Sequence, residues 1–141
     1  MNPTRRDLSL ILPALAAATA SAQERTTLPS KAFRYEDLPV KTNGENKSRA
    51  VLKGETHSGF PIELHMTELA AGQAPHPPHH HVHEELLMLR AGALDATIRG
   101  QATHITAGSV VYLASNDEHG WRNPGPGPAQ YFVIALGKDD A

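Results

Sequence analysis

The sequence predicts an all-β protein, and three observations lead to that prediction. Apolar residues occur in short runs, none of which is long enough for an extended helix. Turn residues, chiefly glycine, separate the runs. Two of the runs alternate apolar and polar residues with the period of two that is typical of a half-buried strand. Such a series of strands suits a sandwich or a barrel, and closure into a barrel would also remove exposed strand edges.

The predicted strands lie within seven runs, at 48–54, 60–69, 83–92, 93–100, 103–108, 109–115 and 129–137. In the second run Ile62, Leu64 and Met66 alternate with polar residues, which predicts one face toward the core and one toward water. Leu94, Ala96 and Ile98 alternate in the same way. The segment 123–129, NPGPGPA, contains three prolines that lack backbone donors and so predicts a stiff connection before the last strand.

The first 22 residues have the pattern of a secretory signal peptide. Arg5 and Arg6 precede an apolar stretch over 8–20, and the small residues at 20–22 suit cleavage. The residues around this arginine pair resemble the twin-arginine export signal, with Leu8 where phenylalanine is usual. The apolar stretch is too short to cross a hydrocarbon core of roughly 30 Å as a helix. We therefore expect a periplasmic or secreted protein with no stable membrane anchor after cleavage.

After residue 22 the sequence predicts three parts: an extended N-terminal arm at 23–47, a barrel domain at 48–137 and a C-terminal tail at 138–141. The arm is polar, and Pro29 and Pro39 interrupt any regular period. An arm of this kind often docks on a partner subunit, so we expect a homodimer. The formal net charge of -2 gives no strong field, so nucleic acid is not an expected partner. The chain has no cysteine, so any metal must be bound by nitrogen and oxygen.

The segment HPPHHHVHEE, at 76–85, contains five histidines and two glutamates. In an extended chain, side chains at positions i, i+2 and i+6 share one face, and His79, His81 and Glu85 have this spacing. Two imidazoles with one carboxylate suit Fe(II), Mn(II), Ni(II), Co(II) or Zn(II). His119 follows a predicted strand over 110–113 and a polar turn, and a neighbouring barrel strand could bring it to the same cavity.

Together these segments resemble the two motifs of the cupin family. The first motif is matched by Gly72, His79, His81, Glu85 and Gly92, and the second by Gly108, His119 and Asn123. Ala114 and Asn116 replace the proline and glycine of the second motif, and the first spacer is six residues rather than five. Asn116 suits the turn because asparagine tolerates left-handed backbone. The resemblance implies a cupin-like double-stranded β-helix (jelly-roll) barrel, frequently dimeric, with a divalent metal at His79, His81, Glu85 and His119.

Four protein ligands on a metal that prefers six leave two adjacent positions open. The resemblance implies dioxygenases, decarboxylases of oxalate type, isomerases and non-catalytic sugar-binding proteins. Among these we favour an O2-using, dioxygenase-like oxidoreductase that acts on a small organic substrate. We expect Fe or Mn as its metal, although Ni, Co, Zn or Cu would also fit. Glu85 is then both a ligand and, as a catalytic residue, a base for an enolic or phenolic proton.

Two other functions compete with this one. A non-catalytic protein could bind a small sugar or carboxylate and use the metal to brace its barrel. The histidine tract could instead scavenge Ni(II) or Cu(II), but Glu85 and His119 would then have no purpose.

The remaining polar residues are harder to place from the sequence. We expect the other histidines of the tract to be exposed or packed behind the ligands: His76, His80 and His83. We expect the isolated histidines to lie at the surface: His57, His65 and His104. Three glutamates are candidates for a second acid or base, and the sequence leaves open which of them faces the cavity: Glu63, Glu68 and Glu118.

Overall fold

The computed structural model of the chain describes residues 27–138, so the signal peptide predicted over 1–22 and the tail residues 139–141 lie outside the described residues. A short 3-10 helix, η1 (Tyr35–Asp37), precedes the strands. The strands are β1 (Val40–Asn43), β2 (Asn46–Glu55), β3 (Pro61–Leu69), β4 (Glu84–Ala91), β5 (Ala93–Ile98), β6 (Gln101–Thr106), β7 (Val110–Leu113), β8 (His119–Arg122) and β9 (Ala129–Leu136). Each of the seven predicted runs overlaps a strand, so the all-β prediction is confirmed.

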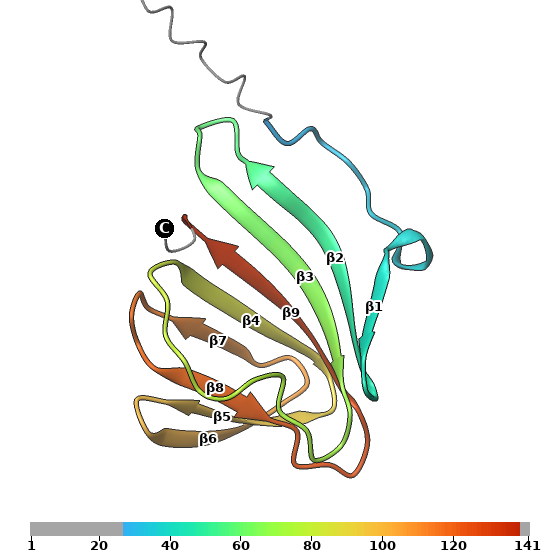
Figure 1. Cartoon of the computed structure of the whole chain (residues 1–141), viewed down its shortest axis with the longest axis vertical. Coiled ribbons are helices and arrows are strands. Elements are labelled where there is room, and N and C mark those ends of the chain that lie inside the picture. Colours follow the sequence, from blue (N-terminus) through green and yellow to red (C-terminus); the bar gives the residue numbers. More distant parts are fainter. Residues whose placement is uncertain (1–26, 139–141) are drawn as a thin grey trace, which may run out of the picture.

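The strands form two antiparallel sheets that pack as a jelly-roll barrel (Figure 1). The larger sheet has the order β1-β2-β3-β9-β4-β7 and the smaller one the order β6-β5-β8. Buried side chains from both sheets make one core between them. Its members are Leu69, Leu87, Leu89, Leu94, Ala96, Val111, Leu113, Trp121, Ala129, Tyr131 and Val133.

Two of the observed strands were not predicted. β1 pairs with β2 through a tight hairpin in which Asn43 lies opposite Asn46 and Gly44 has a φ of 60°. The prediction of an extended arm over 23–47 is therefore wrong at its C-terminal end, because that glycine lets the chain fold back into the sheet. The other unpredicted strand, β8, is only four residues long, too short to show a period.

The register of β3 shows which of its faces points inward. His65 lies opposite Val133 of β9, and Val133 lies opposite Leu87 of β4. Val133 and Leu87 are core residues, and residues paired directly across an antiparallel sheet share a face. Glu63, His65 and Thr67 therefore face the barrel interior. The predicted alternation is confirmed, but the expectation that the polar face of this strand points to water is wrong.

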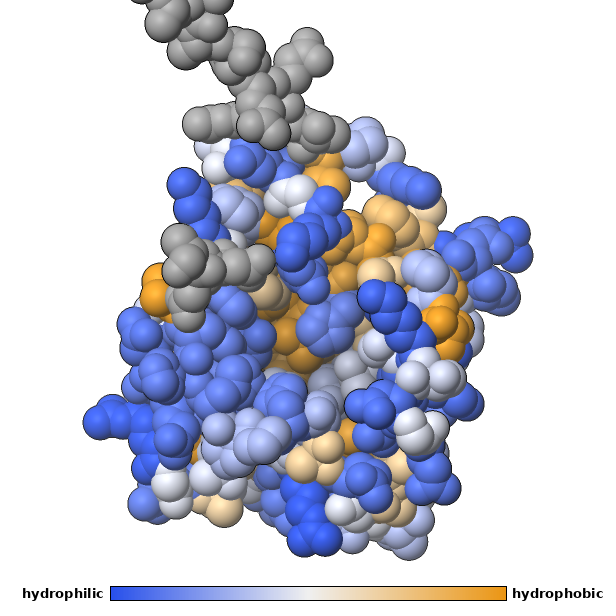
Figure 2. All heavy atoms as spheres, in the orientation of Figure 1, coloured by the Kyte–Doolittle hydropathy of each residue, from blue (hydrophilic) through white to orange (hydrophobic). Residues whose placement is uncertain are grey.

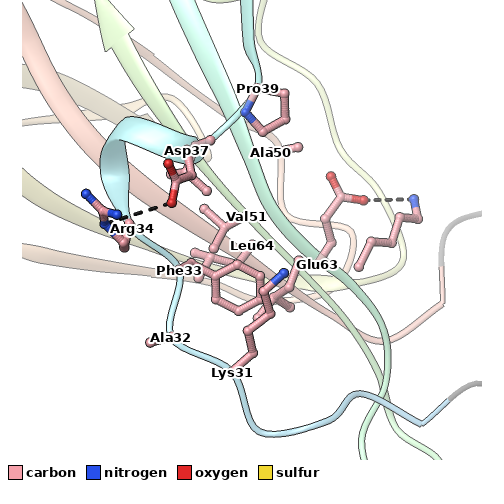
Figure 3. Close-up of a pocket in the computed structure, with 13 residues that line it drawn as sticks. Lys31, Ala32, Phe33, Arg34, Asp37, Pro39, Ala50, Val51, Glu63 and Leu64 are labelled. Atoms are coloured by element: carbon pink, nitrogen blue, oxygen red, sulfur yellow. Dashed lines mark ion pairs between the residues drawn. The ribbon is translucent and has the colours of Figure 1, made fainter.

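The N-terminal arm packs beside β2 and β3, where the Tyr35 ring lies 4.5 Å from the Arg49 guanidinium carbon. A hollow of about 410 Å³ lies between the arm and these strands (Figure 3). Phe33 and Leu64 line it, and none of the four predicted metal ligands does. Figure 2 shows apolar surface across the middle of one face, bordered by hydrophilic residues. Within residues 27–138, no helix is long and apolar enough to span a bilayer.

Candidate metal centre

The histidine tract lies in the connection between β3 and β4, and this connection is held against β8. The amide of His79 donates to the carbonyl of His119 at 2.9 Å, and the amide of His119 donates back to the carbonyl of His79 at 2.8 Å. The connection thus runs alongside the three-stranded sheet and passes in front of β7 and β8 in Figure 1. Two segments that are distant in sequence become neighbours through the backbone alone.

The turn before β8 is also tied to the tract. Asn116 has a φ of 62°, as expected for a left-handed turn residue, and its amide donates to the carbonyl of His81 at 2.8 Å. The turn leads directly into His119, whose side chain is 1% exposed. The position of the second motif's histidine is therefore set by a hydrogen bond to the first motif.

Glu85 completes the cluster from β4, where it lies opposite Leu113 and Ala135. Its Oε1 atom is 3.4 Å from Nε2 of His81, and its Oε2 atom is 3.6 Å from Nε2 of His119. The ligand atoms of His79, His81 and His119 lie within 4.8 Å of one another. The structure thus brings all four predicted ligand residues together, and the cluster could hold a metal ion.

The hydrogen bonds of the rings show which nitrogens face the centre. Nδ1 of His81 bonds the carbonyl of His83 at 2.7 Å, and Nδ1 of His119 bonds the carbonyl of Asp117 at 2.8 Å. A carbonyl only accepts, so Nδ1 carries the proton and a neutral ring keeps a lone pair on Nε2. Both Nε2 atoms are buried and make no hydrogen bond within the described part of the chain. Lone pairs facing a carboxylate at these distances fit an intervening cation.

The electrostatics favour the ligand form of His79. Burial, followed by the neighbouring rings of His76, His119 and His81, lowers the pKa of His79 to about 4, against an opposing effect of Glu85. The imidazole therefore stays neutral at ordinary pH. Neutral imidazole is the form that binds a metal.

The other histidines of the tract differ in position. The His83 ring stacks on His81 with centroids 3.7 Å apart, and its Nε2 atom is 3.4 Å from Oε1 of Glu85. His81, His83 and Glu85 form a second group whose ligand atoms could share an ion. His76 and His80 are exposed, with the His76 ring 4.1 Å from the His79 ring. These positions agree with the expectation that the three lie at the surface or behind the ligands.

The wall beside the centre is mostly apolar. Leu87 and Leu113 are buried in it, and the Trp121 ring stacks on His119 with centroids 5.9 Å apart. The Trp121 indole donates to the hydroxyl of Tyr131 at 2.9 Å. Burial raises the pKa of Tyr131 to about 12. The contact between Trp121 and Tyr131 could not be predicted from the sequence, because Tyr131 is one member of an otherwise apolar run.

One polar group on the opposite wall was not expected from the sequence. His65 is only half-exposed and faces the interior, so its expected surface position is wrong. Its Nδ1 atom is 3.9 Å from Oε1 of Glu63, whose Oε2 atom is 2.8 Å from Nζ of Lys53. Of the glutamates left open, Glu63 faces inward, whereas Glu68 lies on the other face of β3 and Glu118 is exposed. His57 and His104 are exposed as expected.

Residues 65–135, half of the chain, match the family model described as "Cupin domain". This range contains both sequence motifs, which extend from Gly72 to Asn123. No curated protein sequence matches the chain.

Several solved structures share the fold at low sequence identity. KdgF from Halomonas sp. aligns with a TM-score of 0.66 and 15% identity, over 79% of this chain and 98% of that one. The polyketide cyclase RemF from Streptomyces resistomycificus aligns with a TM-score of 0.64 and 15% identity, over 80% and 83%. An RmlC-like cupin from Shewanella frigidimarina aligns with a TM-score of 0.64 and 17% identity, over 77% and 93%. At these identities the likeness shows the jelly-roll fold alone.

Proposed function

Since the chain belongs to the cupin family, we propose that it is a metal-dependent oxidoreductase that uses O2 to oxidise a small organic substrate. In this proposal His79, His81, Glu85 and His119 bind one divalent transition metal, with Fe or Mn as the preferred ion. When bound, the metal would supply redox chemistry and Lewis acidity. The proton transfer belongs to a residue of the chain, Glu85.

One observation supports the metal site above the others. Two buried Nε2 lone pairs, on His81 and His119, face the two oxygens of Glu85 with no hydrogen bond of their own. Buried polar atoms are normally paired, because an unpaired one costs about 1–3 kcal/mol. A cation between these groups would satisfy both nitrogens and the carboxylate at once.

Glu85 has a second role in the proposal, as the base for an enolic or phenolic proton. Its side chain is about one-eighth exposed, at 12%, so it can reach a molecule in the barrel while remaining shielded from bulk water. The buried residues Leu87 and Leu113 beside it keep the wall apolar. A carboxylate in such surroundings can accept a proton from a bound acid.

Metal content tests the site. Untagged protein, purified without a nickel column so that the histidine tract is not loaded artificially, is analysed by mass spectrometry beside His81→Ala, His119→Ala and the exposed control His57→Ala. We expect about one Fe or Mn per chain in the wild type and in His57→Ala, and loss of the metal in the other two variants. Metal that survives both ligand substitutions would contradict the site. More than one metal per chain would favour a metal-scavenging tract.

A separate measurement tests the reaction. Oxygen uptake by the iron- or manganese-loaded protein is screened with small enols and phenols, and Glu85→Gln is compared at equal metal content. We expect uptake in the wild type and its loss in the variant. Unchanged turnover in Glu85→Gln would remove this carboxylate from the proton-transfer step.

The second candidate is a non-catalytic protein that binds a sugar or carboxylate. The deep burial of His119, at 1% exposure, favours it, because a buried ligand can serve a metal that braces the barrel. This function predicts that removal of the metal lowers the melting temperature and that the loaded protein consumes no oxygen with any substrate tried.

Export and dimerisation also belong to the proposal. The signal-like pattern over residues 1–22 supports export, and the polar arm supports a homodimer. Sequencing the N-terminus of protein recovered from a periplasmic fraction should find Gln23 first. Light scattering of that mature protein should give twice the mass of one chain.

A further inference from the structure

A cluster of charged and titratable groups lies on β3, outside the metal centre. Lys53, Glu63 and His65 form it, through the contacts of 2.8 Å between Lys53 and Glu63 and 3.9 Å between Glu63 and His65. Figure 3 shows Glu63 with its carboxylate at an ion pair, marked by a dashed line. The register places Glu63 and His65 on the inner face of the larger sheet. A polar group on the inner wall of a barrel is available to a bound molecule.

The cluster and the metal centre face a common space. Glu63 lies opposite Ala135 of β9, and Ala135 lies opposite Glu85 of β4, so a single small residue separates the two glutamates in this row. Two strand spacings put their backbones about 10 Å apart. In the next row Val133 separates His65 from Leu87. Ala135 is partly exposed, so the space between the two glutamates is open in this row, whereas Val133 in the next row is buried in the core.

A hollow at this end of the sheet supports access of a small molecule to the cluster. It measures about 290 Å³, and its lining includes Lys53, Glu63 and Ala135. The cluster is therefore reachable from solvent beside the row that leads to Glu85.

The orientation of His65 indicates what it offers to a ligand. Its Nδ1 atom lies 3.9 Å from Oε1 of Glu63, too far for a hydrogen bond, but the negative charge of the carboxylate favours the neutral ring that carries its proton on Nδ1. Nε2 is then a hydrogen-bond acceptor. Burial lowers the pKa of His65, against the opposing effects of Glu63 and Glu85, which keeps the ring in this neutral form.

We propose that His65, oriented by Glu63, accepts a hydrogen bond from a hydroxyl group of the molecule bound at the metal. This wall then selects chelating ligands that carry an enolic or phenolic hydroxyl over ligands that chelate through carboxylates alone. The inference rests on the proposed metal site and adds the residue that recognises the hydroxyl group of the substrate.

The experiment uses two probes on zinc-loaded protein, because Zn(II) has no redox chemistry. 4-Nitrocatechol chelates through phenolic oxygens, and its absorption reports binding and distinguishes the singly deprotonated form, which keeps one hydroxyl to donate, from the doubly deprotonated form. Oxalate chelates through carboxylates and has no hydroxyl; its binding is followed by calorimetry. The variants are His65→Leu, Glu63→Gln and the exposed control His57→Leu, and zinc content and melting temperature are measured for each.

We expect His65→Leu to bind 4-nitrocatechol about tenfold more weakly, the loss that one hydrogen bond predicts, and to bind oxalate as the wild type does. Glu63→Gln should weaken 4-nitrocatechol binding in the same direction, and His57→Leu should have no effect. Equal affinity of the wild type and His65→Leu for 4-nitrocatechol at full zinc content would overturn the inference, as would failure of the loaded wild type to bind this probe. Failure of the wild type to take up zinc would instead overturn the metal site.

Discussion

His79 and His119 hold each other through two backbone hydrogen bonds, each amide donating to the other carbonyl at 2.9 and 2.8 Å. Their rings consequently lie with centroids 4.7 Å apart. The two histidines come from separate motifs, and neither motif alone fixes this distance. The geometry of the candidate metal centre therefore depends on backbone contacts around the ligand residues.

Asn116→Val should weaken metal binding although residue 116 is not a ligand. The position has a φ of 62°, which a β-branched residue adopts only with strain, and its amide bonds the carbonyl of His81. Strain of about 1–3 kcal/mol would displace the turn that leads into His119. We expect roughly a tenfold loss of zinc affinity, measured by competition with a chromophoric chelator.

The matched control is Asn116→Gly, because glycine adopts this backbone without strain. It should bind zinc as the wild type does. Equal affinity of the valine variant would show that the turn does not position His119.

Gly92→Ala should destabilise the fold by about 2 kcal/mol or more. Gly92, at the β4–β5 turn, has a φ of 79°, and an added Cβ would lie 2.6 Å from the carbonyl oxygen of Pro128. Both the backbone conformation and the contact oppose a side chain. Thermal unfolding of the metal-free protein should show a melting temperature lower by several degrees.

Gly100→Ala separates the two causes. Gly100 has a similar φ of 78° but no atom within 4 Å of an added Cβ. We expect a smaller decrease in melting temperature in this variant. Equal decreases would mean that backbone conformation accounts for the whole effect and that the Pro128 contact relaxes.

The stability of the wild type should fall as pH rises from about 10 to about 12. Burial raises the pKa of Tyr131 to about 12, whereas a tyrosine in the unfolded chain ionises near 10. The stability that the neutral phenol contributes is complete below pH 10 and is lost as pH rises through the folded-state pKa. Chemical denaturation at several pH values measures this slope.

Tyr131→Phe should be less stable at pH 7, because it leaves the buried Trp121 indole without its acceptor, and its stability should fall less between pH 10 and 12. Tyr112→Phe, at a position that is 58% exposed, is the control and should keep the wild-type slope. An unchanged slope in Tyr131→Phe would assign the alkaline loss to other groups.

The sequence by itself determined the features that depend on neighbouring residues. Short apolar runs between turn residues predicted seven of the strands, and the spacing of His79, His81 and Glu85 predicted three residues of the candidate metal centre, because these patterns depend only on neighbouring residues. The second motif predicted His119 through a resemblance rather than through geometry. Asn123 fitted that motif, and the structure shows its amide bonding the carbonyls of Leu69 and Gly127.

Only the tertiary structure decided which face of each strand points inward. A period of two divides β3 into two faces but does not say which one meets the barrel, so the inward position of Glu63 and His65 could not be predicted. β8 could not be predicted from the sequence either, because it has too few residues to show a pattern. It forms because β5 and the histidine tract provide hydrogen-bond partners on its two sides. Pairing partners are distant in sequence, and it is their packing that selects the face and completes the site.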